Sequence, residues 1–265
     1  MRVGKLNKII QLILFTAILL GFSPVLWAKS VALPRVVSLK PNITMNLIEL
    51  GAEDTVVGMT KYCPKPNESA KVIGDYNSVD IEAVIRLQPD LIVTSTENSQ
   101  SRQFAALKKA GFKIQLLDYS SLAQMKQSFL KLGELVGKKL EATQVIAGMD
   151  SKLEQLKKEQ SLHRVPQSFI VLVQRRPLMV AASGSFVSNL FEEAGLKNAF
   201  GKNAIHYPVM DEEEFIREIV TYTFELVHDA KDFEPEFFNK TVTPLKMQHY
   251  YATPKAIDTL AQLLK

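Results

Sequence analysis

Serine, histidine and carboxylate side chains are suited by type to catalysis or metal binding, but their spacing in this chain supports neither. Ser183-Gly184-Ser185 precedes a predicted helix, yet it does not form the G-x-S-x-G turn that exposes a nucleophilic serine. A serine before a helix is more often an N-cap. The histidines are widely spaced and form no cluster with metal-ligand spacing, at His163, His206, His228 and His249. We therefore predict no catalytic residues, no metal site and no cofactor.

Strands and helices alternate along most of the chain. Predicted strands cover residues 35–39, 55–59, 90–94, 113–117, 168–173, 178–181 and 222–227, and residues 72–74 form a further short apolar segment. Predicted helices cover residues 41–50, 80–87, 103–110, 122–136, 138–160, 185–194, 211–220 and a terminal stretch begun by Pro254. Such alternation is typical of parallel sheets with right-handed crossovers.

The predicted helix over 138–160 stands between two α/β halves. Its apolar stripe consists of Leu140, Val145, Ile146, Met149, Leu153 and Leu156. At 1.5 Å per residue it spans roughly 35 Å, about the width of a small domain. An ordinary long surface helix is the alternative, but its single occurrence at mid-chain favours a spacer. We expect an α/β fold of two lobes with parallel-type sheets joined by one long backbone helix, divided into residues 29–137, 138–163 and 164–265.

The first 28 residues carry the pattern of an export signal. Arg2, Lys5 and Lys8 precede an apolar run over residues 9–20, and Ala28 offers a small residue for cleavage. The alternative is an uncleaved membrane anchor, but the run is short against the about 20 apolar residues of a spanning helix. We predict a signal peptide over residues 1–28 and a mature chain in the periplasm.

Charge and cysteine content exclude further classes of partner and site. The net charge is +4, and removing the signal leaves 29 basic against 28 acidic residues. No basic stripe interleaved with aromatics is present, so we expect no nucleic-acid partner. Cys63 is the only cysteine, which excludes an intramolecular disulfide and a cysteine metal site.

Motifs in both halves resemble one family. They are Arg35-Val36-Val37-Ser38-Leu39 with Pro41-Asn42, Val57-Gly58, Ile73-Gly74-Asp75-Tyr76-Asn77, the stretch 80–93, Arg176-Pro177-Leu178-Met179-Val180, the stretch 185–195, Asn198-Ala199-Phe200 and Tyr207-Pro208-Val209. In this order around a long helix, they resemble the class III periplasmic substrate-binding proteins of ABC importers, the helical-backbone receptors for cobalamin, ferric siderophores and haem. The missing Pro-Asp around 220–222 and the segment 228–251 depart from the family pattern.

The resemblance implies a monomeric receptor that captures a metal chelate and delivers it to an inner-membrane ABC permease with its ATPase. Cobalamin is the first expectation, because Gly74-Asp75-Tyr76-Asn77, Arg176-Pro177-Leu178 and Tyr207-Pro208 most resemble that branch. The alternatives are a ferric siderophore or haem receptor, or a scavenging or sensing module that meets no permease.

The resemblance also implies specific site residues. Glu82 and Glu213, each two residues after an aspartate that begins a helix, would dock onto permease arginines. Glu212 or Glu214 would be the alternative partner in the second lobe. The alternative explanation of all these acidic residues is that they complement the dipole of the helix that they begin. The ligand would lie between one wall of Asn42, Tyr62, Tyr76 and Ser95 and another of Gln174, Arg175, Arg176, Ser185, Phe186, His206 and Tyr207. Each tyrosine is equally well explained as a half-buried packing residue.

Overall fold

The computed structural model describes residues 33–75, 78–201, 203, 205–227, 233–246 and 252–264. Within them, five parallel strands form the first sheet, in the order β3-β2-β1-β4-β5. These are β1 (Val36–Ser38), β2 (Val56–Met59), β3 (Lys71–Val72), β4 (Leu91–Ser95) and β5 (Ile114–Leu117). The central strands β1 and β4 are buried along their whole length, as expected for a parallel sheet covered on both faces.

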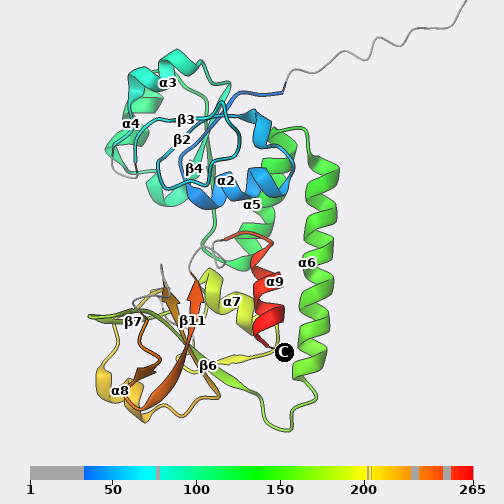
Figure 1. Ribbon diagram of the computed structural model, residues 1–265, viewed down its shortest axis with the longest axis vertical. Coiled ribbons are helices and arrows are strands. Elements are labelled where there is room, and N and C mark those ends of the chain that lie inside the picture. The colour runs from blue at the N-terminus through cyan, green and yellow to red at the C-terminus, as the bar shows by residue number, and fades with distance from the viewer. Residues whose placement is uncertain are drawn as a thin grey trace, which may run out of the picture. The chain divides into compact units, whose positions relative to one another are not determined.

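Helices connect these strands and cover the sheet (Figure 1). They are α2 (Pro41–Glu49), α3 (Ile81–Leu87), α4 (Arg102–Lys109) and α5 (Leu122–Leu135), with short 3-10 turns η1 (Glu53–Thr55) and η2 (Thr96–Asn98). Pro41 occupies the first turn of α2, where a missing N–H is tolerated. Gly51 follows the helix with a φ of +62°, a conformation that glycine adopts without strain.

The second sheet is mixed. Its strands in the described residues are β6 (Ser168–Arg175), β7 (Leu178–Val180), β8 (Lys197–Asn198), β9 (Tyr222–Val227), β10 (Glu236–Phe237) and β11 (Lys240–Lys246). Strands β11, β9 and β6 run parallel, whereas β7 and β10 pair antiparallel at the two ends of the order β10-β11-β9-β6-β7. Helices α7 (Phe186–Glu193) and α8 (Glu212–Arg217) belong to this half.

Two helices link the halves. Helix α6 (Lys139–Gln160) connects the two sheets in the chain, and α9 (Ala256–Leu263) packs along it (Figure 1). One apolar core runs through both halves and includes Leu47, Phe129, Met149, Phe191 and Leu260. Because both halves share this core, rotation of one half against the other disturbs packed side chains. Two smaller apolar clusters lie one in each half, around Val84 and around Phe215.

The predicted fold class is confirmed, with three local corrections. Leu140 was expected on the buried stripe of α6 but is 76% exposed, because the stripe begins at Ala142 and repeats at heptad spacing. The helix expected over 211–220 ends at Arg217, where the chain extends to enter β9. Pro254 lies in a turn of i→i+3 hydrogen bonds that precedes α9 rather than in its first turn.

The β10–β11 hairpin was not predicted. Phe238 and Asn239 form its turn, both with positive φ, without the Asn-Gly signal that usually identifies such turns. Pro244 within β11 argues against a central strand, but in the described residues β10 pairs only with Lys240 and Thr241. The rest of β11 is therefore a sheet edge, where proline is tolerated.

The predicted signal over 1–28 lies outside the described residues. Within the described ranges, no helix combines the length and apolar character needed to cross a bilayer. The residues from Leu33 onward cluster as one compact unit in their contacts. The predicted boundaries at 137 and 163 bracket α6 but remain predictions.

Candidate functional site

The first sheet offers a site where its strand order reverses. From β1 the chain proceeds to β2 and β3 on one side, and then to β4 and β5 on the other. In open α/β sheets, ligands bind in the crevice at the carboxyl ends of the two strands beside this reversal. Here those ends are Ser38 of β1 and Ser95 of β4, which lie on neighbouring strands.

Polar side chains gather at this edge. The Lys40 ammonium lies 3.6 Å from the Glu97 carboxylate, and the Ser95 hydroxyl donates to the same carboxylate at 3.4 Å. The Glu97 side chain is 76% exposed, whereas that of Lys40 is 18% exposed. Asn42 is half-buried in the first turn of α2, and Ser95 is buried. The predicted residues Asn42 and Ser95 therefore lie beside a charged pair that was not predicted.

In the second half, residues 205–210 run beside β7, with bends at residues 205–207 and an antiparallel bridge between Val209 and Met179. The N–H groups of Val180 and Ala182 donate to the carbonyls of Pro208 and His206, at 3.2 and 2.9 Å. Ile205, Tyr207 and Val209 are 62%, 40% and 62% exposed, and the residues between them are half-buried. This segment therefore presents a short row of apolar and aromatic surface around the predicted Tyr207.

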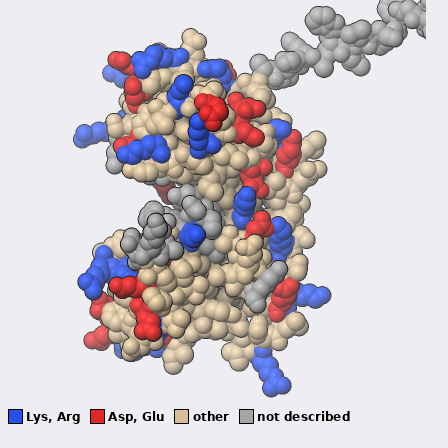
Figure 2. All heavy atoms as spheres, in the orientation of Figure 1, with Lys and Arg blue, Asp and Glu red and all other residues tan. Residues whose placement is uncertain are grey.

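A charge of the first half acts on Tyr207 of the second half. Loss of hydration raises the pKa of its phenol, the negative charge of Glu97 raises it further, and a hydrogen bond with Ser185 partly opposes both. Glu97 follows β4 of the first sheet, so the two side chains lie within electrostatic reach across the halves. Figure 2 shows the surface hollowed between the halves on the face that it draws. A ligand held there would contact both sheets, as cofactor and ligand clefts between lobes usually do.

The start of α7 serves mainly as structure. Ser185 is fully buried, and its hydroxyl donates to the Ala182 carbonyl at 2.9 Å and accepts from the Ser188 N–H at 3.3 Å. It is the helix N-cap, as the sequence suggested. Phe186 is 4% exposed and belongs to the continuous core, so its side chain has almost no surface for a ligand. The His206 ring is half-buried and packs over Gly184.

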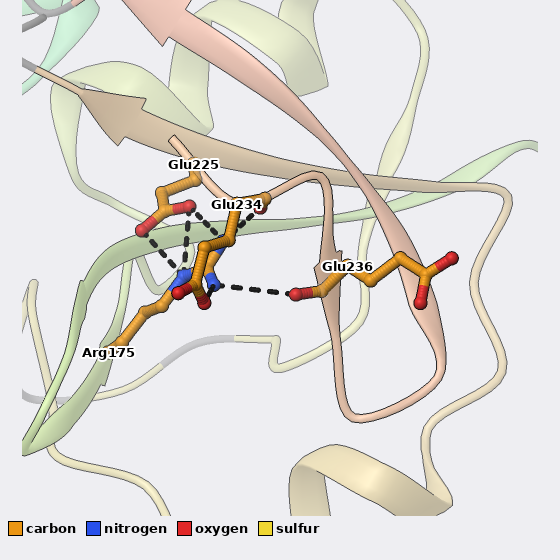
Figure 3. Close-up of polar contacts among 4 residues, drawn as sticks. All are labelled: Arg175, Glu225, Glu234 and Glu236. Atoms are coloured by element: carbon orange, nitrogen blue, oxygen red, sulfur yellow. Dashed lines mark hydrogen bonds and ion pairs between the residues drawn. The ribbon is translucent and has the colours of Figure 1, made fainter. Parts of the chain in front are cut away.

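Arg175 is held by carboxylates of its own half (Figure 3). Its Nε and Nη2 donate to both oxygens of Glu225, at 2.7 to 3.1 Å, and Nη1 donates to Glu234 at 3.0 Å. The carbonyls of Glu234 and Glu236 accept further bonds, and the guanidinium lies 4.8 Å from the Phe237 ring centre. This arginine therefore fastens β6 to β9 and to the β10 hairpin. We leave Arg175 and Phe186 out of the proposed ligand contacts.

The other predicted ligand residues have mixed placement. Gln174 and Arg176 are exposed at the end of β6 and in the turn that follows it, and the Gln174 amide donates to the Arg176 carbonyl. Tyr62 is 53% exposed, and the Lys61 ammonium lies 4.8 Å from its ring centre. Lys61 also pairs with Asp75 at 3.4 Å. Tyr76 lies outside the described residues.

Both predicted docking glutamates lie on exposed helix starts. Asp80 caps α3 by accepting from the Ala83 N–H at 2.9 Å, and Asp211 caps α8 by accepting from the Glu213 N–H at 2.8 Å. Glu82 has an 87% exposed side chain, and Glu213 is exposed as well. Because the two aspartates already serve as N-caps, the glutamates are not needed for capping.

Lys40 and Glu97 are the site residues that sequence reasoning missed. A signal existed, since Lys40 directly follows the predicted strand 35–39 and Glu97 lies three residues after the predicted strand 90–94, where parallel sheets place functional side chains. Among the described residues, no group of three or more His, Cys, Asp and Glu side chains is placed to hold a metal ion.

The carboxyl ends of β1 and β4, with Lys40 and Glu97, form what we call the switch-point edge, and the segment 205–210 of the other half forms a second wall. Two α/β halves that are joined by a long helix and carry these two walls define a two-lobed ligand receptor. The chain belongs to the periplasmic binding protein family, whose model matches residues 36–243. The resemblance inferred from the motifs is confirmed. Members of this family are binding proteins.

Individual relatives agree with this assignment. The Vitamin B12-binding protein of Vibrio cholerae serotype O1 is 22% identical over 199 residues, covering 74% of this chain and 72% of that protein. The crystal structure of the periplasmic vitamin B12 binding protein BtuF of Vibrio cholerae superposes with a TM-score of 0.70 at 20% identity, over 88% of this chain and 95% of that one. The periplasmic haem-binding protein HutB of Vibrio cholerae superposes with a TM-score of 0.74 at 14% identity, over 87% and 98%.

Proposed function

We propose that this chain is a periplasmic receptor, without catalytic activity, that captures cobalamin and delivers it to an ABC importer. The observation that carries the proposal is the Lys40–Glu97 ion pair at the carboxyl ends of β1 and β4, whose carboxylate is near enough to Tyr207 of the other half to raise the pKa of its phenol. Relatives named for vitamin B12 binding support cobalamin as the first ligand. The export pattern of residues 1–28 supports the periplasm.

The proposed ligand contacts are those that lie at the switch-point edge, on the 205–210 segment or exposed nearby. They are Asn42, Tyr62, Ser95, Gln174, Arg176, His206 and Tyr207, to which we add Lys40 and Glu97. Tyr76 lies outside the described residues and stays in the proposal on the resemblance alone. Ser185 is fully buried and would act through its hydrogen bond with Tyr207 rather than as a direct contact. An aromatic ring with a hydroxyl, such as Tyr207, suits a large planar chelate that is apolar on its face and polar at its rim. Glu97 would accept hydrogen bonds from amide groups of such a ligand.

Calorimetric titration of the mature protein from Lys29 onward tests the ligand, with cyanocobalamin, haemin and a small siderophore panel as probes. We expect tight one-to-one binding of cyanocobalamin. Saturable binding of haemin or a siderophore alone would move the protein to the iron branch of the family, whose haem-binding members share the fold. If none of the probes binds, the proposal that this chain is a receptor for a metal chelate is contradicted.

A matched pair of variants tests the site. Tyr207→Phe removes a hydroxyl beside the hollow between the halves. Tyr222→Phe removes a hydroxyl outside the proposed site, which donates a hydrogen bond of 2.7 Å to Gln167. We expect ligand affinity to fall several-fold for Tyr207→Phe and to stay constant for Tyr222→Phe, as one hydrogen bond is worth about 0.5–1.5 kcal/mol. Equal affinities in both variants would remove Tyr207 from the site.

Permease docking through Glu82 and Glu213 is the second part of the proposal. Two exposed carboxylates, one in each half, would set register and steer the encounter with basic groups of the permease. Charge reversal at both positions should lower uptake while ligand affinity survives. Unchanged uptake would favour the scavenging module instead. Size-exclusion chromatography with light scattering tests the expected monomer.

A further inference from the structure

Helices α3 and α8 carry the same seven-residue arrangement, at residues 80–86 and 211–217. Each begins with a capping aspartate, followed by an exposed glutamate at the third position. The fifth position is fully buried, as Val84 in one helix and Phe215 in the other. The sixth is an isoleucine and the seventh an exposed arginine. The match between the two helices therefore extends beyond their acidic residues.

The isoleucine at the sixth position is exposed in both helices. Ile85 is 54% exposed and Ile216 is 50% exposed. The neighbouring buried residue already supplies the contact with the core, and the two cores differ. Val84 packs among aliphatic side chains such as Ile92, whereas Phe215 packs against the rings of Phe237 and Phe238. A single exposed isoleucine needs no explanation, but its recurrence over two unrelated cores indicates a shared surface role.

Helix geometry places the isoleucine beside the glutamate. Residues three and four apart share one face, so Glu82, Ile85 and Arg86 are neighbours, and so are their counterparts in α8. Arg86 lies 3.7 Å from the Glu82 carboxylate, and the Arg217 Nε donates to the Glu213 carbonyl at 3.2 Å. In Figure 1, α3 and α8 both lie on the side away from α6. Each half therefore exposes an apolar contact within a charged rim.

We propose that Ile85 and Ile216 are the apolar anchors by which the two halves dock onto the permease. This inference rests on the proposed docking of Glu82 and Glu213. Exposed charge pairs mainly steer association, whereas lasting contact comes from apolar side chains at the centre of an interface. Each isoleucine enters an apolar patch on the permease that lies beside the basic group paired with the glutamate.

Charge selects the permease over a second copy of this chain as the occupant. The α3 surface carries Asp80 and Glu82 against Arg86. The α8 surface carries four acidic residues at 211–214 against Arg217. Both surfaces are net acidic, so two copies would repel each other here, and the fitting partner is apolar and basic.

Uptake into spheroplasts tests the proposal. Spheroplasts of the source bacterium that lack this gene receive purified mature protein and radiolabelled cyanocobalamin, or haemin if calorimetry favours it. The protein concentration that gives half-maximal uptake reports docking. We expect the double variant Ile85→Ala/Ile216→Ala to raise it at least about tenfold, as for truncated interface anchors, with ligand affinity and melting temperature unchanged. Ile48→Ala, at a 39% exposed isoleucine of α2, is the matched control.

The charge variant Glu82→Gln/Glu213→Gln separates the two levels of the proposal. If it impairs uptake and the isoleucine variant does not, the anchors are refuted and docking by the glutamates stands. If neither variant changes uptake, the docking proposal fails and the anchors fail with it. If both raise the half-maximal concentration and Ile48→Ala does not, the anchor role is supported.

Discussion

Replacement of Arg175 by alanine tests whether this residue holds the second half together or binds ligand. Its side chain is 17% exposed and that of Glu225 is 12% exposed, so the variant leaves a nearly buried carboxylate without its bidentate partner. Breaking a buried pair costs about 3–5 kcal/mol. Some water still reaches both groups, which places the expected loss near the lower end, at about 3 kcal/mol.

Thermal and urea unfolding measure this loss. For a domain of this size each kcal/mol shifts the melting temperature by about 2–4 °C, so we expect a decrease of about 6–12 °C. Glu234 is 82% exposed, and Glu234→Ala is the control, expected within about 0.5 kcal/mol of the parent. In a double-mutant cycle, Arg175→Ala and Glu225→Ala should be clearly non-additive, because each removes the same interaction.

A different outcome would refute the structural role. If Arg175→Ala unfolds like the parent protein but loses affinity for the ligand, the guanidinium is free to face the recess and the bonds to Glu225 are not maintained in solution. If stability falls and affinity of the remaining folded protein is kept, the fastening of β6 to β9 explains the residue.

Three further predictions concern the packing of the core, the stability of the fold at alkaline pH and the switch-point edge. Met149→Ala, at a 2% exposed position of α6, should cost about 2–5 kcal/mol in urea unfolding, whereas Leu140→Ala at a 76% exposed position should cost less than about 0.5 kcal/mol; equal costs would contradict the observed stripe. Burial raises the pKa of Tyr119, opposed in part by the hydrogen bond from Asn46, so the folded state keeps this proton at pH values where the unfolded state loses it. Stability should therefore be unaffected by this phenol below its ordinary pKa of 10.0 and should fall as pH rises above it, and Tyr119→Phe should flatten that fall in unfolding measured against pH. Glu97→Gln removes the charge beside Tyr207, so the Tyr207 phenol should ionise at lower pH by absorbance titration; an unmoved transition would mean that the two side chains do not face each other.

Local patterns account for the parts of the fold that were predicted. The strands β1, β4 and β6 are short apolar runs bounded by turn residues, and helix α6 repeats its apolar residues at helical spacing. These signals depend on neighbouring residues alone, because side-chain direction follows the period of the element. Where competing local signals met, prediction failed. The sequence analysis predicts no strand over β11, which contains Pro244, and the position of that strand at a sheet edge makes the proline acceptable.

The sequence by itself determined the two α/β halves, the long helix between them and the exposed acidic helix starts at Glu82 and Glu213. Only the tertiary structure decided which polar groups meet. Arg175 could have faced a ligand, but residues 50 and 59 positions further along the chain supply the carboxylates that hold it. Lys40 pairs with Glu97 because the sheet order places β1 beside β4. Glu97 acts on Tyr207 because the segment 205–210 of the second half lies within electrostatic reach of the end of β4. A charged side chain's role depends on its partners and its hydration, and both are set by segments far apart in sequence.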